Sequence, residues 1–213
     1  MSHDDTASRL LNAAGPIFAE KGYQKATVRE ICAAAGVNLA SVNYYFRDKE
    51  RLYIETVKRA AQLRAEQAPM PEWPAGTPTA IKLRSFIYTI LTRMLGTTQA
   101  PWQVRLMQRE VVQPTSACRE LVEEYFRPHF ELLQRIVGEA VPPDTPPHTR
   151  RQIAFSVIGQ CLHYRLAGDV IGLLVPADEL ASRYTTDQLA DHIAAFSLAA
   201  LGLAPPLGGA PGK

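Results

Sequence analysis

Apolar residues recur along most of this chain at the spacing of a helix, and no stretch shows the alternation typical of a strand. Apolar side chains three or four residues apart fall on one face of a helix. The first run places Leu10, Ala14 and Phe18 on one face and stops at Gly22, a residue that favours helix ends. Further helical runs cover residues 79–96, 100–112, 116–140, 147–167 and 186–203. The pattern predicts an all-α fold.

Two short helical patterns meet at Gly36. Thr27 and Glu30 form a capping box, in which each side chain accepts a hydrogen bond from the other residue's backbone, so a helix is predicted to begin at residue 28. Its apolar stripe runs to Ala35. Gly36 then permits the left-handed conformation that ends a helix. This first helix is predicted to be barely two turns long.

A second short helix follows the turn, with Val37, Val42 and Phe46 predicted to point inward. Small, amide and phenolic side chains remain outside, a composition that suits a helix lying in the major groove of DNA. With the helix that ends at Gly22, the pair completes a predicted three-helix helix-turn-helix domain. The outward residues are Asn38, Leu39, Ala40, Ser41, Asn43, Tyr44 and Tyr45.

Proline and capping residues predict how the rest of the chain is organised. Asp48 is a plausible N-cap for a fourth helix that reaches about residue 67. Four prolines then make residues 68–79 a loop or linker. Pro128 lies inside a helical run and is expected to kink or break it, because it has no backbone N–H. We predict one domain over residues 1–50, a helical bundle over residues 51–204 and a disordered tail over residues 205–213.

Composition and charge fit a folded protein that contacts phosphate. The chain has 213 residues, and 46% of them are apolar, which is ample for a buried core. Its net charge of +2 is unevenly placed: residues 1–60 hold nine Lys or Arg against seven Asp or Glu, and the remainder holds fourteen of each. The small basic excess therefore falls in the segment with the helix-turn-helix pattern.

Cysteine spacing and hydropathy predict a cytoplasmic protein outside the membrane. The three cysteines form no Cys-x-x-Cys pair, and the amino terminus has no signal-peptide pattern. The most apolar stretch, residues 153–175, is long enough to span a bilayer, but polar residues such as Arg165 and Asp169 interrupt it. A buried helix is therefore favoured over a membrane span.

Residues 8–60 resemble the TetR family of bacterial transcriptional repressors, through the capping box, the Gly-Val turn and the run Tyr-Tyr-Phe-Arg-Asp-Lys-Glu. In that family the residues matching Thr27 and Lys49 contact phosphate. The third helix of the family usually ends in Tyr-x-His-Phe, whereas this chain has Asn43-Tyr44-Tyr45-Phe46, so the resemblance passes the phosphate contact to Tyr44 or Tyr45. The predicted DNA-binding residues are Thr27, Arg29, Asn38, Leu39, Ala40, Ser41, Asn43, Tyr44, Tyr45 and Lys49.

Scattered motifs beyond the first domain are similar to the subfamily of the CecR regulator. They include Arg109-Glu110 before Pro114-Thr115, Phe126-Arg127-Pro128, and Gly159-Gln160-Cys161-Leu162. The resemblance implies that residues 51–204 form an effector-binding and dimerisation domain. It further implies a homodimer that represses transcription from a double-stranded DNA operator and is released by a small molecule. An activator, or a regulator without a ligand, is the alternative among DNA-binding proteins.

An effector pocket is one interpretation of the polar residues in the second domain. Arg105 and Arg109 share a helical face beside apolar residues, so their guanidinium groups would orient an anionic or aromatic ligand. An ion-pair network with Glu120, Glu123 or Glu124 is the competing interpretation. The predicted ligand-binding residues are Trp102, Arg105, Arg109, Phe126, Phe130, Gln160 and Tyr164.

Other motifs argue against catalysis and for self-association. The sequence lacks a nucleophile elbow, a P-loop, a dinucleotide fingerprint and a His-Glu-x-x-His motif, so we expect neither an enzyme nor a bound cofactor or metal. A helical enzyme, or an adaptor whose first domain only resembles a DNA reader, is the alternative from another class. Residues 153–166 and 186–203 carry more apolar surface than one inward stripe needs, which favours a four-helix homodimer interface.

Overall fold

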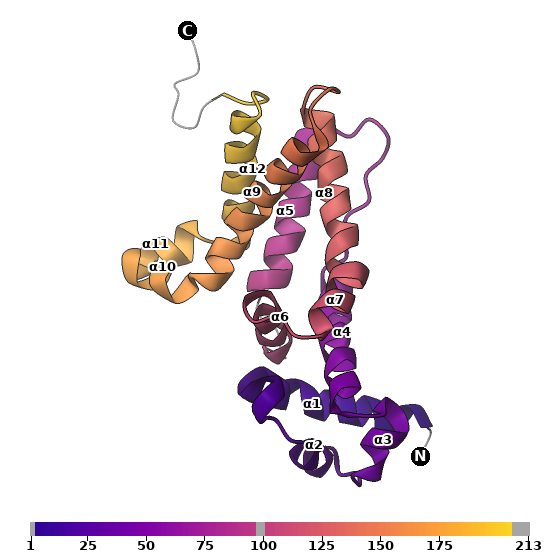
Figure 1. Ribbon diagram of the computed structural model, residues 1–213. Helices are drawn as coiled ribbons and strands as arrows, with labels where there is room; N and C mark the ends of the chain where they lie inside the picture. Colours follow the sequence, from indigo (N-terminus) through magenta and orange to yellow (C-terminus); the bar gives the residue numbers. More distant parts are fainter. Residues whose placement is uncertain (1–2, 97–100, 206–213) are drawn as a thin grey trace. The chain divides into compact units, whose positions relative to one another are not determined.

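The computed structural model describes residues 3–96 and 101–205, and every regular element within them is a helix (Figure 1), which confirms the all-α prediction. The predicted tail, residues 205–213, lies outside these ranges except for its first residue. The helices are α1 His3–Lys25, α2 Val28–Ala35, α3 Ala40–Phe46, α4 Lys49–Gln67, α5 Thr79–Leu95, α6 Trp102–Val112, α7 Ala117–Leu121, the π-helix η1 Val122–Phe126, α8 Arg127–Ala140, α9 Pro147–Leu166, α10 Gly168–Leu174, α11 Ala177–Arg183 and α12 Thr186–Ala200.

Packing divides the chain into two compact units that are not continuous in sequence. The first falls within Met1–Gln67 and Thr97–Pro128, and the second within Ala68–Gly96 and His129–Lys213. Helices α6 and α7 therefore belong with α1 to α4, because they share one core with them. The boundary predicted at residue 50 divides DNA binding from effector binding and dimerisation, and it stays a prediction.

The first unit is built on α1 and α4, against which α2, α3, α6 and α7 pack. Phe18 of α1 meets Tyr53 of α4 edge to face, with ring centroids 4.8 Å apart. Ile31 of α2 and Val42 of α3 complete this core, and both are buried as predicted. The two short helices are thus fixed from behind by apolar contacts, while their other faces remain exposed to solvent.

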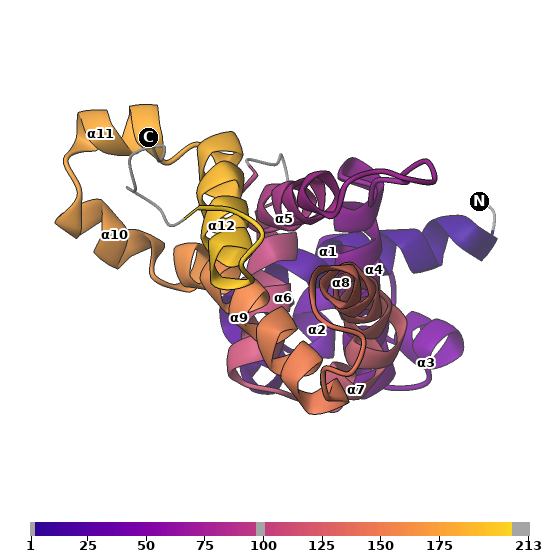
Figure 2. The same cartoon turned by 90° about the horizontal axis from the view of Figure 1, so that it is seen from above.

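The second unit packs α5, α9 and α12 together, as the view from above in Figure 2 shows. Phe86 of α5 and Ile193 of α12 are fully buried, and α8 adds Leu133 to the same core. Thr185 and Gln188 form a second capping box at the start of α12. Among the described helices, none is both long and apolar enough to cross a membrane.

Pro128 was predicted to kink or break its helix, and the structure shows a widened turn before it instead of a break. The backbone before it widens into the π-helix η1, in which the Arg127 N–H bonds to the Val122 carbonyl. Proline cannot donate to the carbonyl four residues back, and its ring crowds that carbonyl. Widening the preceding turn relieves this conflict, so the helical run continues as α8 instead of ending.

The sequence pattern missed α10 and α11. It predicts helices that end at residue 167 and resume at residue 186, whereas two seven-residue helices occupy the intervening segment. Two glycines and Pro176 lie in this segment, and neither helix has a buried residue. The sequence therefore shows no stripe of core-facing apolar residues from which these helices could be predicted.

Candidate DNA-binding surface

The capping box at the start of α2 is present with the predicted partners. Thr27 Oγ1 accepts a hydrogen bond from the Glu30 N–H at 3.2 Å, and Glu30 Oε2 accepts one from the Thr27 N–H at 3.1 Å. Glu30 also pairs with Lys21 of α1. Hydrogen bonds from Lys21 and then Thr27 lower the pKa of Glu30, so this carboxylate stays charged and holds the start of α2.

A residue that the sequence pattern gave no reason to notice closes the turn between α2 and α3. Gly36 adopts φ 64° and ψ 40°, the left-handed conformation predicted for it. The Arg9 guanidinium of α1 donates to the Ala35 and Gly36 carbonyls at 2.5 and 3.1 Å. A Cβ on Gly36 would lie 2.9 Å from Arg9 Nη2, so glycine serves both the backbone angle and this contact.

Asn38 and Ser41 fix the first turn of α3. Asn38 Oδ1 accepts hydrogen bonds from both the Ser41 backbone N–H and the Ser41 hydroxyl, each at 3.0 Å. Asn38 therefore holds the turn that leads into α3, whose N-cap position is Leu39, although both residues were predicted from the sequence only as DNA contacts. The Asn38 amide nitrogen is not used in these two bonds.

The outer face of α3 carries the predicted reading residues. Val42 and Phe46 are buried, so the opposite side of the helix faces solvent, and Tyr44 is 70% exposed there. Its ring meets that of half-buried Tyr45 edge to face, with centroids 4.9 Å apart. Four further predicted DNA contacts on this segment are exposed: Asn38, Leu39, Ala40 and Asn43.

Cations lie on both sides of α3. Arg29 is exposed on α2, as predicted for a DNA contact. Lys49 begins α4, where its Nζ lies 4.7 Å from the centre of the Tyr23 ring and donates to the Gln24 carbonyl at 3.4 Å. Both contacts anchor Lys49 to the end of α1, so its ammonium group is held at a fixed place beside the reading helix.

The turn from α3 to α4 is unusually tight. Arg47 has φ 73° and ψ −48°, and the Asp48 N–H donates to the Phe46 carbonyl at 2.8 Å, which closes a γ-turn. Asp48 Oδ1 then accepts from the Arg51 N–H at 2.8 Å and caps α4 as predicted. The exposed Arg47 side chain is thereby placed between the reading helix and Lys49.

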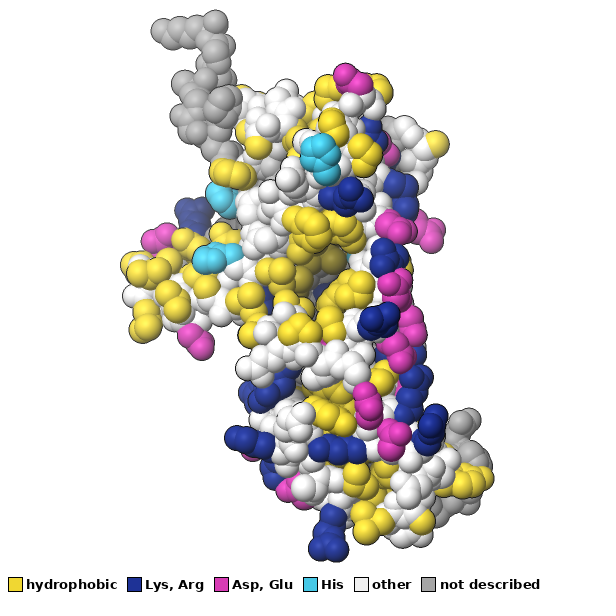
Figure 3. Space-filling view, viewed as in Figure 1, with side chains coloured by type: hydrophobic (Ala, Val, Ile, Leu, Met, Phe, Trp, Pro, Cys, Tyr) yellow, Lys and Arg dark blue, Asp and Glu magenta, His cyan; other side chains and the backbone are white. Residues whose placement is uncertain are grey.

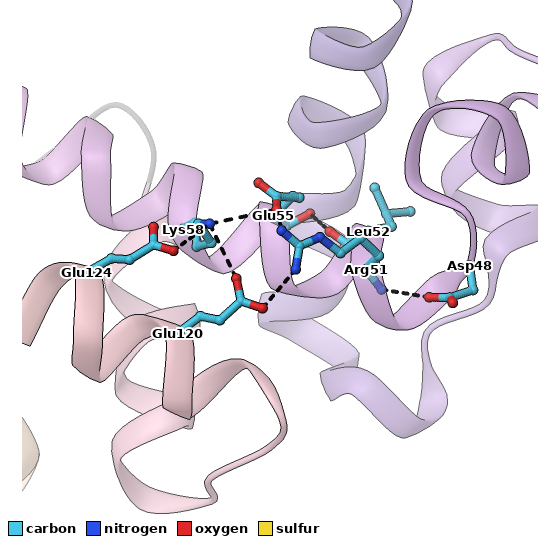
Figure 4. Close-up of polar contacts among 8 residues, drawn as sticks. Asp48, Arg51, Leu52, Glu55, Lys58, Glu120 and Glu124 are labelled. Atoms are coloured by element: carbon cyan, nitrogen blue, oxygen red, sulfur yellow. Dashed lines mark hydrogen bonds and ion pairs between the residues drawn. The ribbon is translucent and has the colours of Figure 1, made fainter.

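A charge network holds α4 to α7 and η1 (Figure 4). Arg51 pairs with Glu120 at 2.7 Å and with Glu55 of its own helix. Lys58 reaches Glu120 at 3.3 Å and Glu124 at 2.8 Å, and the Glu124 hydrogen bond is the main cause of its raised pKa. Arg51 and Lys58 thus connect α4 to Glu120 and Glu124 of the segment α7–η1, across 62 to 69 residues of sequence.

A buried polar contact joins α4 to α6. Glu110 is fully buried and accepts hydrogen bonds from the Tyr53 hydroxyl, the Thr115 N–H and the Thr115 hydroxyl. Burial, followed by the hydrogen bond to Glu110, raises the pKa of Tyr53 well above its ordinary value. The two motifs Arg109-Glu110 and Pro114-Thr115 therefore belong to one hydrogen-bonded site.

Comparison with protein families gives two matches that together cover most of the chain. Residues 10–56 match the bacterial regulatory proteins of the tetR family, and residues 80–201, more than half of the chain, match the carboxy-terminal domain of the HTH-type transcriptional dual regulator CecR. This chain belongs to the TetR family. Its carboxy-terminal part belongs to the CecR branch, so the resemblance inferred from the sequence is confirmed.

Individual relatives agree with that assignment. CecR of Shigella flexneri is 28% identical over 177 residues, which cover 79% of either chain. A TetR-like regulator from Rhodococcus sp. RHA1 shares the fold with a TM-score of 0.66 at 18% identity, over 95% of this chain and 98% of that one. The crystal structure of AibR in complex with isovaleryl coenzyme A and operator DNA has a TM-score of 0.64 at 18% identity, over 90% and 97%.

The structure divides the predicted effector residues of this TetR-family chain between its two units. Trp102, Arg105, Arg109 and Phe126 lie in the first, and Phe130, Gln160 and Tyr164 lie in the second. Trp102 packs against α1, where a Cβ on Gly15 would lie 2.5 Å from its ring. Arg109 donates to the Ala19 and Glu20 carbonyls at 3.2 and 3.1 Å. Both side chains thus hold α6 on α1, and their effector contact stays a prediction.

The remaining predicted effector residues have varied surroundings. Arg105 is exposed, and Phe126 packs on the core of the first unit. Phe130 stacks on Phe155 with centroids 4.5 Å apart, while the Gln160 amide donates to the Ser156 carbonyl of its own helix. Tyr164 packs on the core of the second unit.

The competing interpretation of the two arginines, a network with the glutamates of α7 and η1, is wrong. Glu120 and Glu124 bind Arg51 and Lys58 instead, and Glu123 pairs with Arg127 at 2.6 Å. These partners come from α4 and from the next helical turn, and α6 contributes none of them. Gln103 of α6, which sequence reasoning passed over, is 3% exposed, and its Oε1 has no hydrogen-bond partner among the described residues.

Proposed function

We propose that this protein is a ligand-responsive repressor that binds a palindromic operator as a homodimer and leaves it when a small molecule binds. The supporting observation is the outer face of α3, which exposes Tyr44 and Asn43 while Val42 and Phe46 fix the helix from behind. A helix held in this way can enter the major groove without disturbing its own core.

Contacts to phosphate and contacts to bases are proposed for different residues. Lys49, Arg29, Thr27 and one of the two tyrosines are proposed to meet phosphates, since cations and hydroxyls flank α3. Base contacts are proposed for the first turn of α3 and its outer face, where side chains are short enough to approach base edges. These residues are Asn38, Leu39, Ala40, Ser41 and Asn43.

The homodimer is proposed to form through the outer faces of α9 and α12. Phe155 of α9 is 61% exposed and Phe196 of α12 is 50% exposed, so each helix carries a large apolar side chain outside the core of its own unit. One helix as short as α3 reads only a few base pairs, and two copies are needed for useful affinity. Half-sites about one helical turn apart, or a multiple of it, follow from this arrangement.

Release requires an effector that binds the free dimer more tightly than the DNA-bound one. A hundredfold loss of operator affinity corresponds to about 2.7 kcal/mol of coupling. AibR, a relative in fold, binds isovaleryl coenzyme A and operator DNA, which supports a small-molecule effector here. Gln103 is added to the proposed effector residues, because a buried acceptor without a donor is a group that a bound molecule would satisfy.

An activator remains the second candidate, and the match to a dual regulator supports it. We also propose that the protein acts in the cytoplasm and has no catalytic role, since the relatives above are regulators. A helical enzyme or adaptor would bind DNA without sequence preference, if it bound at all.

Fluorescence anisotropy with the DNA that flanks the chain's own gene tests the proposal. Wild-type protein is expected to prefer a palindromic fragment over scrambled DNA by at least about a thousandfold. Tyr44→Ala and Lys49→Ala should weaken binding to every sequence, and Lys49→Ala should also reduce its salt dependence, whereas Ser41→Ala should alter base preference. Equal affinity of the wild type for both fragments would reject the proposed function.

A further inference from the structure

Helices α10 and α11 form a projecting segment, residues 168–183, that we call the arm. Each helix has seven residues, and neither contains a buried side chain. Figures 1 and 2 both show the arm extending away from α5 and α12. Helices this short do not persist in water without packing contacts. The arm therefore needs a surface beyond those that its own unit offers.

One face of α10 is apolar and open to solvent. Val170, Leu173 and Leu174 lie three and four residues apart, so they form a single stripe, and they are 56%, 89% and 76% exposed. Hydrophobic side chains gather over the arm in Figure 3. Isolated exposed leucines are ordinary, but a stripe of three exposed apolar residues on a helix without a buried side chain is typical of an interaction site.

Exposed apolar residues also occur on the two helices that flank the arm in the sequence, α9 and α12. The arm begins two residues after Leu166, which is 46% exposed, and leads into α12, which exposes Phe196. These are the helices whose outer faces, with Phe155, are proposed above to meet a second copy. The arm is thus joined at both ends to helices of the proposed dimer interface.

The charges of the arm are complementary to those of α9, which indicates α9 as the helix of the second copy that the arm contacts. The arm carries Asp169, Asp178 and Glu179 against Arg183, and in the part of the chain that the structure describes none of these carboxylates has an ion-pair partner. Helix α9 contains no acidic residue at all. Its arginines and histidines are His148, Arg150, Arg151, His163 and Arg165.

We propose that the arm of each copy packs on the outer face of α9 in a second copy of this chain, with Val170, Leu173 and Leu174 at the contact. The inference rests on the homodimer proposed above and assigns it a further element. Two-fold symmetry repeats the contact twice, so both arms are covered and no apolar stripe is left to recruit more copies.

A double variant of the full chain, Leu173→Asp with Leu174→Asp, tests the arm by sedimentation equilibrium. Four leucines leave the interface of the dimer, so its dissociation constant is expected to rise by about a hundredfold or more. Val112→Asp is the matched control, because Val112 is 58% exposed in the other unit, and it should change the constant by less than about threefold.

Photo-crosslinking supplies a second readout that does not depend on the stability of a variant. A benzophenone amino acid at position 173, in dimers mixed from 14N- and 15N-labelled chains, should give mixed-isotope crosslinks to peptides of α9. A double variant that dimerises as tightly as wild type, or crosslinks confined to one chain, would overturn the arm while leaving the homodimer intact. A monomeric wild type would overturn the homodimer itself and the arm with it.

Discussion

Arg47 combines an unfavourable backbone with a useful position. Among the described residues it is the one non-glycine residue with a positive φ. Such a conformation costs on the order of 1–3 kcal/mol and persists only where the surroundings impose it. Here the γ-turn ends α3 and begins α4 within two residues, so the backbone is reversed sharply and a cation is left exposed beside the proposed reading surface.

Comparison of Arg47→Gly with Arg47→Ala separates these two effects. Both variants lose the cation, so both should weaken DNA binding and lower the slope of log affinity against log salt by about one. Glycine relieves the positive φ and alanine does not, so the glycine variant should be the more stable by about 1 kcal/mol. Urea unfolding and salt-titrated anisotropy measure the two quantities. Equal stability of the variants would show that the turn is unstrained.

Burial of Tyr53 is expected to make the free energy of unfolding decrease at alkaline pH. Its folded-state pKa is raised above the ordinary 10.0 by burial and by Glu110, so on raising the pH the unfolded chain releases this proton first. The stabilisation is complete below pH 10 and is lost as the pH rises above it. Between pH 10 and 11 the free energy of unfolding should fall more steeply in the wild type than in Tyr53→Phe, by up to about 1.4 kcal/mol.

The same variant has a second expected cost at neutral pH. Tyr53→Phe leaves a buried carboxylate with one donor fewer, which should lower the free energy of unfolding by about 1–3 kcal/mol. Urea titrations at pH 7, 10 and 11 measure both effects. Parallel pH profiles for the two proteins would exclude Tyr53 as the titrating group.

At the scale of elements, α6 is fitted closely to α1 at two glycines. A Cβ on Gly15 would lie 2.5 Å from the Trp102 ring, and a Cβ on Gly22 would lie 2.8 Å from Arg109 Nη1. Gly22 also has φ 75°, which breaks α1 near its end as the sequence predicted. The close approach of these helices is therefore encoded by small residues on α1 and large residues on α6.

Gly15→Ala should destabilise the protein even though alanine is the better helix former. The added methyl group overlaps Trp102, and such overpacking costs about 1–3 kcal/mol. Gly138→Ala is the matched control in α8, because its nearest neighbour would be 3.9 Å away, and it should stabilise by about 0.5–1 kcal/mol. Thermal unfolding compares the two. Stabilisation by both substitutions would mean that α6 does not press on α1 at this point.

For the whole molecule, assembly and DNA binding are expected to depend on each other. Ala194 lies in the core of its own unit at 4% exposed, so a charge there would disturb folding, whereas Phe196 reaches solvent. Phe196→Arg should therefore produce a folded monomer and reduce operator affinity by at least about a hundredfold, because a single α3 reads too few base pairs. Light scattering and anisotropy measure the two outcomes.

Ile81→Arg is the control for this substitution. Ile81 is 54% exposed on α5 of the same unit and lies outside the proposed interface. The control variant should remain dimeric and bind the operator normally. A Phe196→Arg protein that is monomeric yet retains full operator affinity would separate assembly from DNA reading and contradict the proposed coupling.

The sequence by itself determined the reading element and most of the helices, with α10 and α11 as exceptions. Capping by Thr27 and Asp48, the break at Gly36 and the inward positions Val42 and Phe46 all appear where the pattern placed them. These features are local, because a cap or a helical stripe depends on residues within one or two turns of each other. A disturbance at Pro128 was predictable for the same reason, but the π-helix that accommodates it was not.

Only the tertiary structure decided which helices share a core and what each long side chain contacts. Arg9 closes a turn 26 residues away, Glu110 accepts from Tyr53 across 57 residues, and Arg109 binds α1 across 90 residues. No local pattern marks such pairs, because they arise when the folding of the chain brings distant helices together. The exposure of the arm likewise depends on which surfaces the rest of the fold has already covered.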